Sequence, residues 1–472
     1  MGSIIASRLA LFPRGSYRGP HNASRLALEG ENGMDNVVAG GLRGESTDGV
    51  VAFRGIRYAR AERFGPPQRV SAHDGTRDAT SRGPSAPQLP SRLTAVMGAP
   101  APFEQSEDCL RLTVTAPAQA VPGGHAVLVW LHGGAYLTGG GEWNLYDADR
   151  LVRDTGIVVV SVSYRLGMLG YLRAQGVSPG NLGLLDQLTA LEWVRDNIRA
   201  FGGDPARVTV AGQSAGAHSV VAMLGSGRAE GLFARAIVQS APFGVGFHRP
   251  ADAERVGAVF LGELGGDPRT AAVSEILAAQ ARTAVRLAGP GGLNSAPPLL
   301  PVCEIEVLPG DWRRLVSERA ARTPVLVGCT AAEMRAFYDG PHPVFGRVRR
   351  APVIGRRLTA VAERVVGRKV FEDGVFRFAD LLTESGGTAF CYRFGALHPD
   401  GPFGACHCIE LPLLFGAADD WRAAPMVRPL DSARLDELGV RTRGYWGEFV
   451  RTGSLGDRPR HRHGSRAVLE LP

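Results

Sequence analysis

The stretch VTVAGQSAGAHSVVAML, residues 208–224, places Ser214 between two glycines. A β-branched run precedes the serine and a small-residue run typical of a helix follows it, so the pattern predicts a sharp strand-to-helix turn. Gly212 and Gly216 would let the strand and the helix approach each other, which lifts the serine oxygen clear of the sheet. Glycine and serine are common residues, so the motif alone also fits an ordinary turn. A nucleophilic role for Ser214 therefore needs partners elsewhere in the chain.

One set of partners would be donors that hold negative charge as it develops on a substrate oxygen. The segment LHGGAYLTGG, residues 131–140, follows a strand-like run. Gly133 and Gly134 have no side chains, so their N–H groups could face a substrate. The N–H of Ala215, the residue after the serine, would complete this oxyanion hole at the start of a helix. Taken alone, the segment also fits a glycine-rich turn at the end of a strand.

The elements that must position these residues indicate an α/β protein. Residues 186–201 carry apolar positions at helical spacing, and residues 49–59 alternate as a small antiparallel lead-in would. Strands that alternate with helices predict a central, mostly parallel sheet flanked by helices on both faces. The runs expected to form buried strands are 126–131, 156–164, 207–212, 234–240, 323–328 and 389–394.

The sequence predicts a single α/β domain over residues 34–472, because it has no internal repeat and no long low-complexity tract. Residues 65–102 and part of 250–300 are rich in loop-forming residues. Residues 1–33 are set apart from the fold, since their short apolar patch is interrupted by Arg8 and no charged region precedes it. They are interpreted as a disordered leader, a vector-derived segment or an over-called start ahead of Met34.

Composition and motifs limit the kinds of molecule that the protein is expected to bind. The net charge is +7 and the pI about 9.3, but Lys369 is the only lysine, the arginines are scattered, and no nucleic-acid-binding motif is present. No apolar run is long enough to span a membrane. The six cysteines are irregularly spaced, which favours free thiols and a cytoplasmic location. Cys406 and Cys408 flank His407 without a further ligand pair, so neither a metal nor a cofactor is predicted.

Several motifs together resemble the type-B carboxylesterases, the α/β-hydrolases that include cholinesterases and bacterial para-nitrobenzyl esterases. The resemblance extends from about residue 40 to residue 456 and implies an α/β-hydrolase fold and a small-molecule ester substrate. The matching segments are FRGIRYA (53–59), RFGPP (63–67), SEDCLRLTV (106–114), HGGAY (132–136), VSYRLGMLGYL (162–172), NLGLLDQLTALEWVRDNIRAFGGDPARVTVAGQSAG (181–216) and, more weakly, YWGEFVRTGSLG (445–456).

The resemblance also assigns a catalytic triad in the order serine, acid, histidine. It implies that Ser214 attacks, that His407 takes its proton, and that Glu333 orients the imidazole. His407 stands three residues before Glu410, as the family's histidine stands before a glutamate. His132 is expected to act through its backbone and His218 to pack. Glu304, Glu306 and Asp339 stay open as the acid, whereas His342, His398, His461 and His463 lack the family's flanking pattern.

Two departures from the family bear on the chemistry. Gln213 stands where the family often has a glutamate, so a cationic substrate would miss that charge. Cys408 replaces the glycine after the histidine. The predicted function is hydrolysis of neutral carboxylic esters through an acyl-enzyme, with activity falling through roughly pH 6 to 7 if His407 titrates near its usual pKa. The alternative is a catalytically weak or inactive adhesion or binding protein on the same fold.

Overall fold

The computed structural model describes residues 27–29, 35–70, 77–288, 297–338 and 354–472. Most of the predicted leader, together with Met34, Asp339 and His342, lies outside these ranges. Residues 27–29 form a short strand that pairs with residues 36–38.

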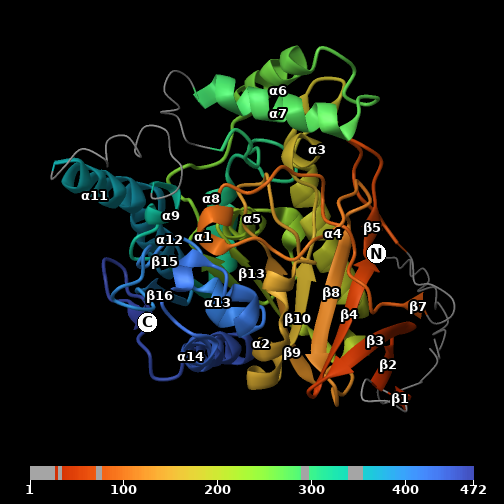
Figure 1. Cartoon of the computed structure of the whole chain (residues 1–472), viewed down its shortest axis with the longest axis vertical. Coiled ribbons are helices and arrows are strands. Elements are labelled where there is room, and N and C mark those ends of the chain that lie inside the picture. Colours follow the sequence, from red (N-terminus) through yellow and green to blue (C-terminus); the bar gives the residue numbers. More distant parts are fainter. Residues whose placement is uncertain (1–26, 30–34, 71–76, 289–296, 339–353) are drawn as a thin grey trace, which may run out of the picture.

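A mixed sheet of 13 strands runs through the molecule (Figure 1). Its order is β1-β2-β3-β4-β8-β10-β9-β13-β14-β15-β16-β17, with β7 beside β3. The strands are β1 (Ala27–Glu29), β2 (Asp35–Ala39), β3 (Leu42–Thr47), β4 (Val50–Arg57), β7 (Arg77–Asp78), β8 (Arg111–Pro117), β9 (His125–Leu131), β10 (Val158–Val162), β13 (Gly203–Gln213), β14 (Arg235–Gln239), β15 (Val325–Thr330), β16 (Ala389–Phe394) and β17 (Leu469–Leu471). Two small sheets pair β5 (Ala59–Arg60) with β6 (Gln68–Arg69), and β11 (Arg173–Ala174) with β12 (Ser178–Pro179).

Strand direction divides the sheet into two parts. The pairs β1-β2, β2-β3, β3-β4, β4-β8 and β8-β10 are antiparallel. Every neighbouring pair from β10 to β17 is parallel. This topology confirms the α/β fold with an antiparallel lead-in. The carboxyl ends of the parallel strands all meet at one edge of the sheet, which is where ligands bind in such folds.

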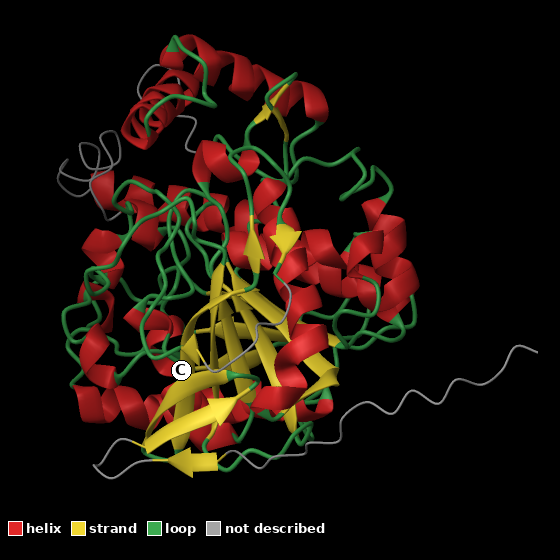
Figure 2. Cartoon of the chain, turned by 90° about the vertical axis from the view of Figure 1, so that its right-hand side faces the viewer, coloured by secondary structure: helices red, strands yellow, loops and turns green. Residues whose placement is uncertain are grey.

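Helices cover both faces of the sheet (Figure 2). Side chains of α4, α5, α8 and α12 join the buried cluster on one face, and those of α2, α13 and α14 join the cluster on the other. The helices are α1 (Thr94–Met97), α2 (Asp149–Thr155), α3 (Gly167–Tyr171), α4 (Leu182–Asn197), α5 (Ala215–Leu224), α6 (Pro250–Leu264), α7 (Val273–Ala288), α8 (Trp312–Ala320), α9 (Arg335–Tyr338), α11 (Ile354–Gly367), α12 (Asp373–Glu384), α13 (Leu411–Leu414) and α14 (Ser432–Thr452).

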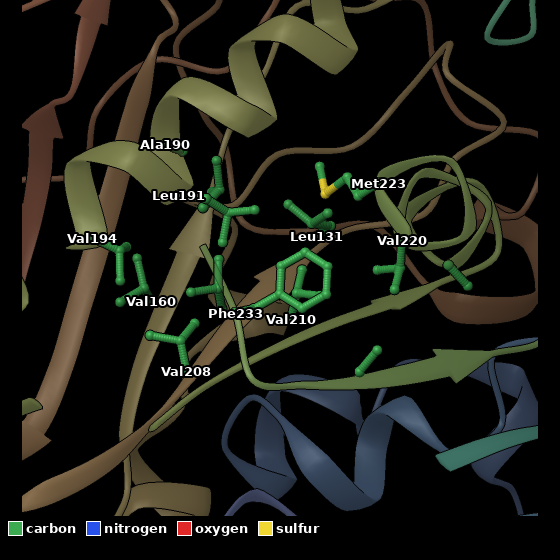
Figure 3. Close-up of a cluster of buried hydrophobic side chains, with 14 of the residues drawn as sticks. Leu131, Val160, Ala190, Leu191, Val194, Val208, Val210, Val220, Met223 and Phe233 are labelled. Atoms are coloured by element: carbon green, nitrogen blue, oxygen red, sulfur yellow. The ribbon is translucent and has the colours of Figure 1, made fainter. Parts of the chain in front are cut away.

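The core beneath the predicted turn is closely packed. Val208 and Val210 of β13, Leu131 of β9, and Val220 and Met223 of α5 belong to one buried cluster (Figure 3). All five side chains are almost completely buried. Because interiors are packed as densely as organic crystals, this cluster fixes α5 on the sheet and leaves the turn between β13 and α5 little freedom.

Two further observations concern membrane-spanning helices and cysteines. Within the described residues, no helix combines the length and the apolarity that crossing a membrane requires. All six cysteines are free thiols, and five of them are buried.

Candidate active site

Ser214 occupies the turn between β13 and α5 with backbone angles φ 55° and ψ −119°. A positive φ is uncommon for a residue with a side chain and is retained only where neighbours hold it. Here the Ser214 N–H donates to the Gln239 carbonyl at 2.8 Å, and its own carbonyl accepts from the His218 N–H at 2.9 Å. The chain therefore forms the strained strand-to-helix turn that the sequence predicts.

The two flanking glycines are required by close approach of the backbone. A Cβ atom on Gly212 would lie 2.6 Å from the Gly216 carbonyl oxygen and 2.8 Å from the Ala217 nitrogen. A Cβ atom on Gly216 would overlap the carbonyl oxygen of Leu131. No side chain could be accommodated at either position without moving the backbone of β9 or α5.

The glycine-rich loop after β9 passes directly beside the serine. A Cβ atom on Gly133 would lie 2.5 Å from Gln213 Oε1 and 3.1 Å from Ser214 Cβ, so this position also has to be free of a side chain. Gly134 follows with φ 115°. Ala215 is the first residue of α5, so its N–H is one of the unpaired donors at a helix N-terminus. The structure thus places Gly133 close to Ser214, and Ala215 follows Ser214 directly in the chain.

Glu333 and His407 form a buried pair. Glu333 lies in the turn after β15 and His407 in the segment between β16 and α13. Oε2 of Glu333 accepts a hydrogen bond from His407 Nδ1, and Oε1 accepts one from the Thr330 N–H at 2.8 Å. Both side chains are almost fully buried, so the carboxylate fixes the orientation of the ring and the tautomer with the proton on Nδ1.

The other ring nitrogen of His407 faces the serine turn. Its Nε2 atom lies 3.1 Å from Nε2 of Gln213, the residue before the serine. With the proton on Nδ1, Nε2 is an acceptor and the Gln213 amide donates to it. Among the described residues, Ser214 makes no hydrogen bond to this nitrogen. Gln213, predicted as part of the substrate pocket, therefore contacts the predicted base directly.

The charge beside His407 changes the expected pH dependence. Burial lowers the pKa of His407, but the charges of Cys408 and Glu333 and their hydrogen bonds to the ring outweigh burial, so the net pKa lies well above the usual value. Burial raises the pKa of the Cys408 thiol, whereas the neighbouring His407 lowers it.

The acid limb of activity is accordingly expected above the pH 6 to 7 inferred from the sequence. A base must be neutral to accept a proton, so kcat/KM should fall as the pH drops through the raised His407 pKa. A pH profile of p-nitrophenyl ester hydrolysis measures this limb. The rate of inactivation by an alkyl fluorophosphonate, which has no titrating group of its own, should show the same limb. Constant rates down to pH 5 would contradict the assignment of the base.

The competing candidates lie elsewhere. Glu304 and Glu306 are exposed, and Glu304 pairs with Arg249 at 3.8 Å. His461 contacts Asp380, and His463 contacts Glu384 and Asp380. His398 contacts Asp400. The ring of His132 bonds to the Gly133 carbonyl and stacks on Tyr164. No group of three or more histidine, cysteine or acidic side chains in the described ranges could hold a metal ion.

Comparison with known proteins bears on this arrangement. A model of the carboxylesterase family matches residues 34–344, well over half of the chain. The chain belongs to the carboxylesterase family. It is an enzyme of this family, a carboxylic ester hydrolase.

Relatives of this carboxylesterase cover nearly its whole length. It is 58% identical over 429 residues to a probable N-octanoylanthranilate hydrolase from Rhodococcus erythropolis, covering 90% of this chain and 94% of that protein. It is 32% identical over 459 residues to the para-nitrobenzyl esterase of Bacillus subtilis strain 168, covering 88% and 89% of the two chains. A solved structure of a thermophilic PNB esterase superimposes with a TM-score of 0.79 at 29% identity, covering 91% and 94%.

The carboxylesterase also buries a second carboxylate near the site, and nothing in the sequence indicated the role of this carboxylate. Glu410 is fully buried, its Oε1 accepts from Gln239 Nε2 at 3.4 Å, and its Oε2 has no partner among the described residues. Burial and then the charge of Glu333 raise its pKa to about 7. The spacing of three residues after His407 was the only signal for Glu410 in the sequence.

Cys408 adopts the conformation that the family's glycine would favour. Its φ is 73°, in the left-handed region where a side chain is strained. We expect Cys408→Gly to be more stable to urea than Cys408→Ala by up to about 1 kcal/mol, because the relief of strain exceeds the extra chain entropy of glycine. In a helix or a strand, the glycine variant would instead be the less stable of the two. An alanine variant as stable as the glycine variant would show that the position carries no strain.

Proposed function

We propose that this carboxylesterase hydrolyses neutral carboxylic esters through an acyl-enzyme, with Ser214 as the nucleophile, His407 as the base and Glu333 as the acid that orients it. The observation that carries the proposal is the buried Glu333–His407 hydrogen bond, which leaves the other ring nitrogen of His407 directed at Gln213, the residue before Ser214. Catalytic hydrogen bonds are often long or unformed before substrate binds, so the Gln213 contact is compatible with this role.

The proposed reaction uses these three side chains in turn. His407 Nε2 takes the Ser214 proton as Oγ attacks the ester carbonyl, and Glu333 stabilises the imidazolium that forms. The N–H groups of Gly133, Gly134 and Ala215 would hold the oxyanion of the tetrahedral intermediate. His407 then gives the proton to the departing alcohol, which leaves an acyl group on Ser214. Water, activated by His407 in the same way, releases the acid and restores the enzyme, with no metal or cofactor needed.

A second candidate substrate is an N-acyl derivative of an aminobenzoate. The printed function of the Rhodococcus erythropolis relative, hydrolysis of N-octanoylanthranilate, supports it. That substrate carries a carboxylate next to its amide, and Gln213 presents a neutral amide where a glutamate would repel such a group. If this substrate is used, Gln213→Glu should raise the KM for it by at least about tenfold, which corresponds to about 1.4 kcal/mol of charge repulsion. The KM of a neutral ester should stay nearly constant in the same variant.

Fluorophosphonate labelling tests the proposed function directly. One alkyl phosphonyl group per chain should be found on the peptide containing Ser214 by mass spectrometry. The Ser214→Ala variant should remain unlabelled, and Ser226→Ala, which changes a buried serine away from the turn, should label like the wild type. No labelling of the folded wild type, or labelling of another serine, would overturn the assignment of Ser214.

A further inference from the structure

Three buried side chains link the glycine-rich loop to helix α5. The Tyr136 hydroxyl lies 3.2 Å from His218 Nδ1, and Ser219 Oγ lies 3.4 Å from the Tyr136 oxygen. Tyr136 is 1% exposed, His218 2% and Ser219 0%. Both contacts can be hydrogen bonds if Ser219 donates to the Tyr136 oxygen and the Tyr136 hydroxyl donates to His218 Nδ1. From the sequence, His218 is predicted only to pack.

The bridge joins the two segments that carry the proposed oxyanion donors. Tyr136 lies two residues after Gly134 in the same loop, whereas His218 lies on the first turn of α5, three residues after Ala215. Donors from two separate segments act together only if the distance between the segments is fixed. The Tyr136–His218 hydrogen bond is a direct side-chain connection between them.

The loop needs such an anchor because its backbone is strained. Gly134, Ala135 and Tyr136 have φ values of 115°, 56° and 62°, three successive residues in the left-handed region. Residues with side chains adopt this region at a cost and keep it only where surrounding contacts determine it. The Tyr136 carbonyl accepts from the Gly167 N–H at 2.7 Å, and the side chain supplies the connection to α5.

His218 is itself held firmly as the acceptor. Its ring stacks on Phe247 with centroids 4.4 Å apart, and Phe247 packs edge-on against Trp312 of α8 at 5.1 Å. Burial, with a contribution from nearby His248, lowers the pKa of His218 to about 3. The imidazole is therefore neutral at all working pH values, and Nδ1 stays available as an acceptor.

We propose that Tyr136 and His218 are positioning residues of the oxyanion hole, which hold the Gly133–Gly134 loop at a fixed distance from Ala215. The inference rests on the proposed acyl-transfer function. Loss of the bridge lets the loop shift, and a displacement of about 1 Å at a reacting centre costs on the order of 10²-fold in rate. The loss should appear in kcat, because the oxyanion exists only after attack.

The experiment compares variants at both ends of the bridge. Tyr136→Phe and His218→Leu should each lower kcat for a p-nitrophenyl ester at least about tenfold with little change in KM. The double variant should be no worse than the poorer single one, because both remove the same hydrogen bond. His218→Asn should restore most of the activity, since its Oδ1 lies near the position of Nδ1 and accepts the same bond.

Controls separate positioning from a general loss of stability. Tyr58→Phe removes an equally buried bond, from the hydroxyl to the Ser163 carbonyl at 2.8 Å, and should keep the wild-type kcat. Binding of a trifluoromethyl ketone, which forms an oxyanion on Ser214, should weaken in parallel with kcat/KM across the bridge variants. The acid limb of the pH profile should stay at its wild-type midpoint, because His407 is untouched.

The outcomes are distinct. Wild-type kcat in both Tyr136→Phe and His218→Leu, or equal losses in His218→Asn and His218→Leu, would overturn the positioning role. If a variant fails to fold, as shown by thermal unfolding, the fluoroketone affinity of folded His218→Asn decides: near wild type supports the bridge, and a large loss contradicts it. An active Ser214→Ala enzyme would instead remove the proposed function itself.

Discussion

Replacing Ser214 or His407 by alanine is expected to lower kcat for p-nitrophenyl butyrate about 10⁶-fold, and replacing both is expected to cost no more than either alone. The reason is that the serine is a weak nucleophile until the imidazole takes its proton, so each residue is ineffective without the other. Initial rates with purified single and double variants measure this. The residual activity should remain above the rate in buffer, because the oxyanion donors still bind the transition state.

The matched control for this prediction lies in the same chain. His461, near the C-terminus, is a buried histidine paired with a carboxylate, as His407 is. Its partner is Asp380 rather than Glu333. His461→Ala should keep kcat within a small factor, whatever it does to stability. Additive losses in the Ser214→Ala/His407→Ala double variant would mean that the two residues do not form one catalytic unit.

Replacing Glu333 by glutamine is expected to lower kcat about 10⁴-fold while the protein stays folded. The carboxylate accepts from His407 Nδ1 and from the Thr330 N–H, whereas a carboxamide presents one donor and one acceptor. Nδ1 can then lose its proton to Nε2, the nitrogen that must be free to act as the base. The imidazolium formed during attack also loses its counter-charge.

Glu304→Gln and Glu306→Gln are the controls, because these residues were alternative acids in the sequence and are exposed in the structure. Both variants should hydrolyse esters at the wild-type rate. The acid limb of Glu333→Gln should also move to lower pH, since one of the two neighbouring groups that raise the His407 pKa has lost its charge. A Glu333→Gln enzyme with wild-type kcat would exclude this residue as the acid.

Much of the fold could be predicted from the sequence because local signals were strong. The β-branched runs at 126–131 and 389–394 are strands within a residue of the expected ends. The turn at Ser214 was predictable because only glycine fits at positions 212 and 216. The steric requirement therefore appears in the sequence as two glycines that flank the serine. The antiparallel lead-in followed from alternation alone.

The contacts that tune the site could not be predicted because they join distant parts of the chain. Gln213 and His407 are separated by 194 residues, and their hydrogen bond depends on how the segment after β16 docks on the sheet. The pairing of Tyr136 with His218 depends on three successive left-handed residues, only the first of which is glycine. A side chain that packs and one that accepts a hydrogen bond look alike in a helical sequence pattern.

The order of the elements along the chain has a consequence for biosynthesis. The strained turn and its supporting strand lie within residues 203–224, but the proposed acid follows β15 and the proposed base follows β16, which itself pairs with β17. A nascent chain therefore exposes the serine turn long before it holds a base. Onset of ester hydrolysis during translation or refolding reports the docking of the last third of the polypeptide, and C-terminal truncation should abolish turnover before it disturbs the central strands.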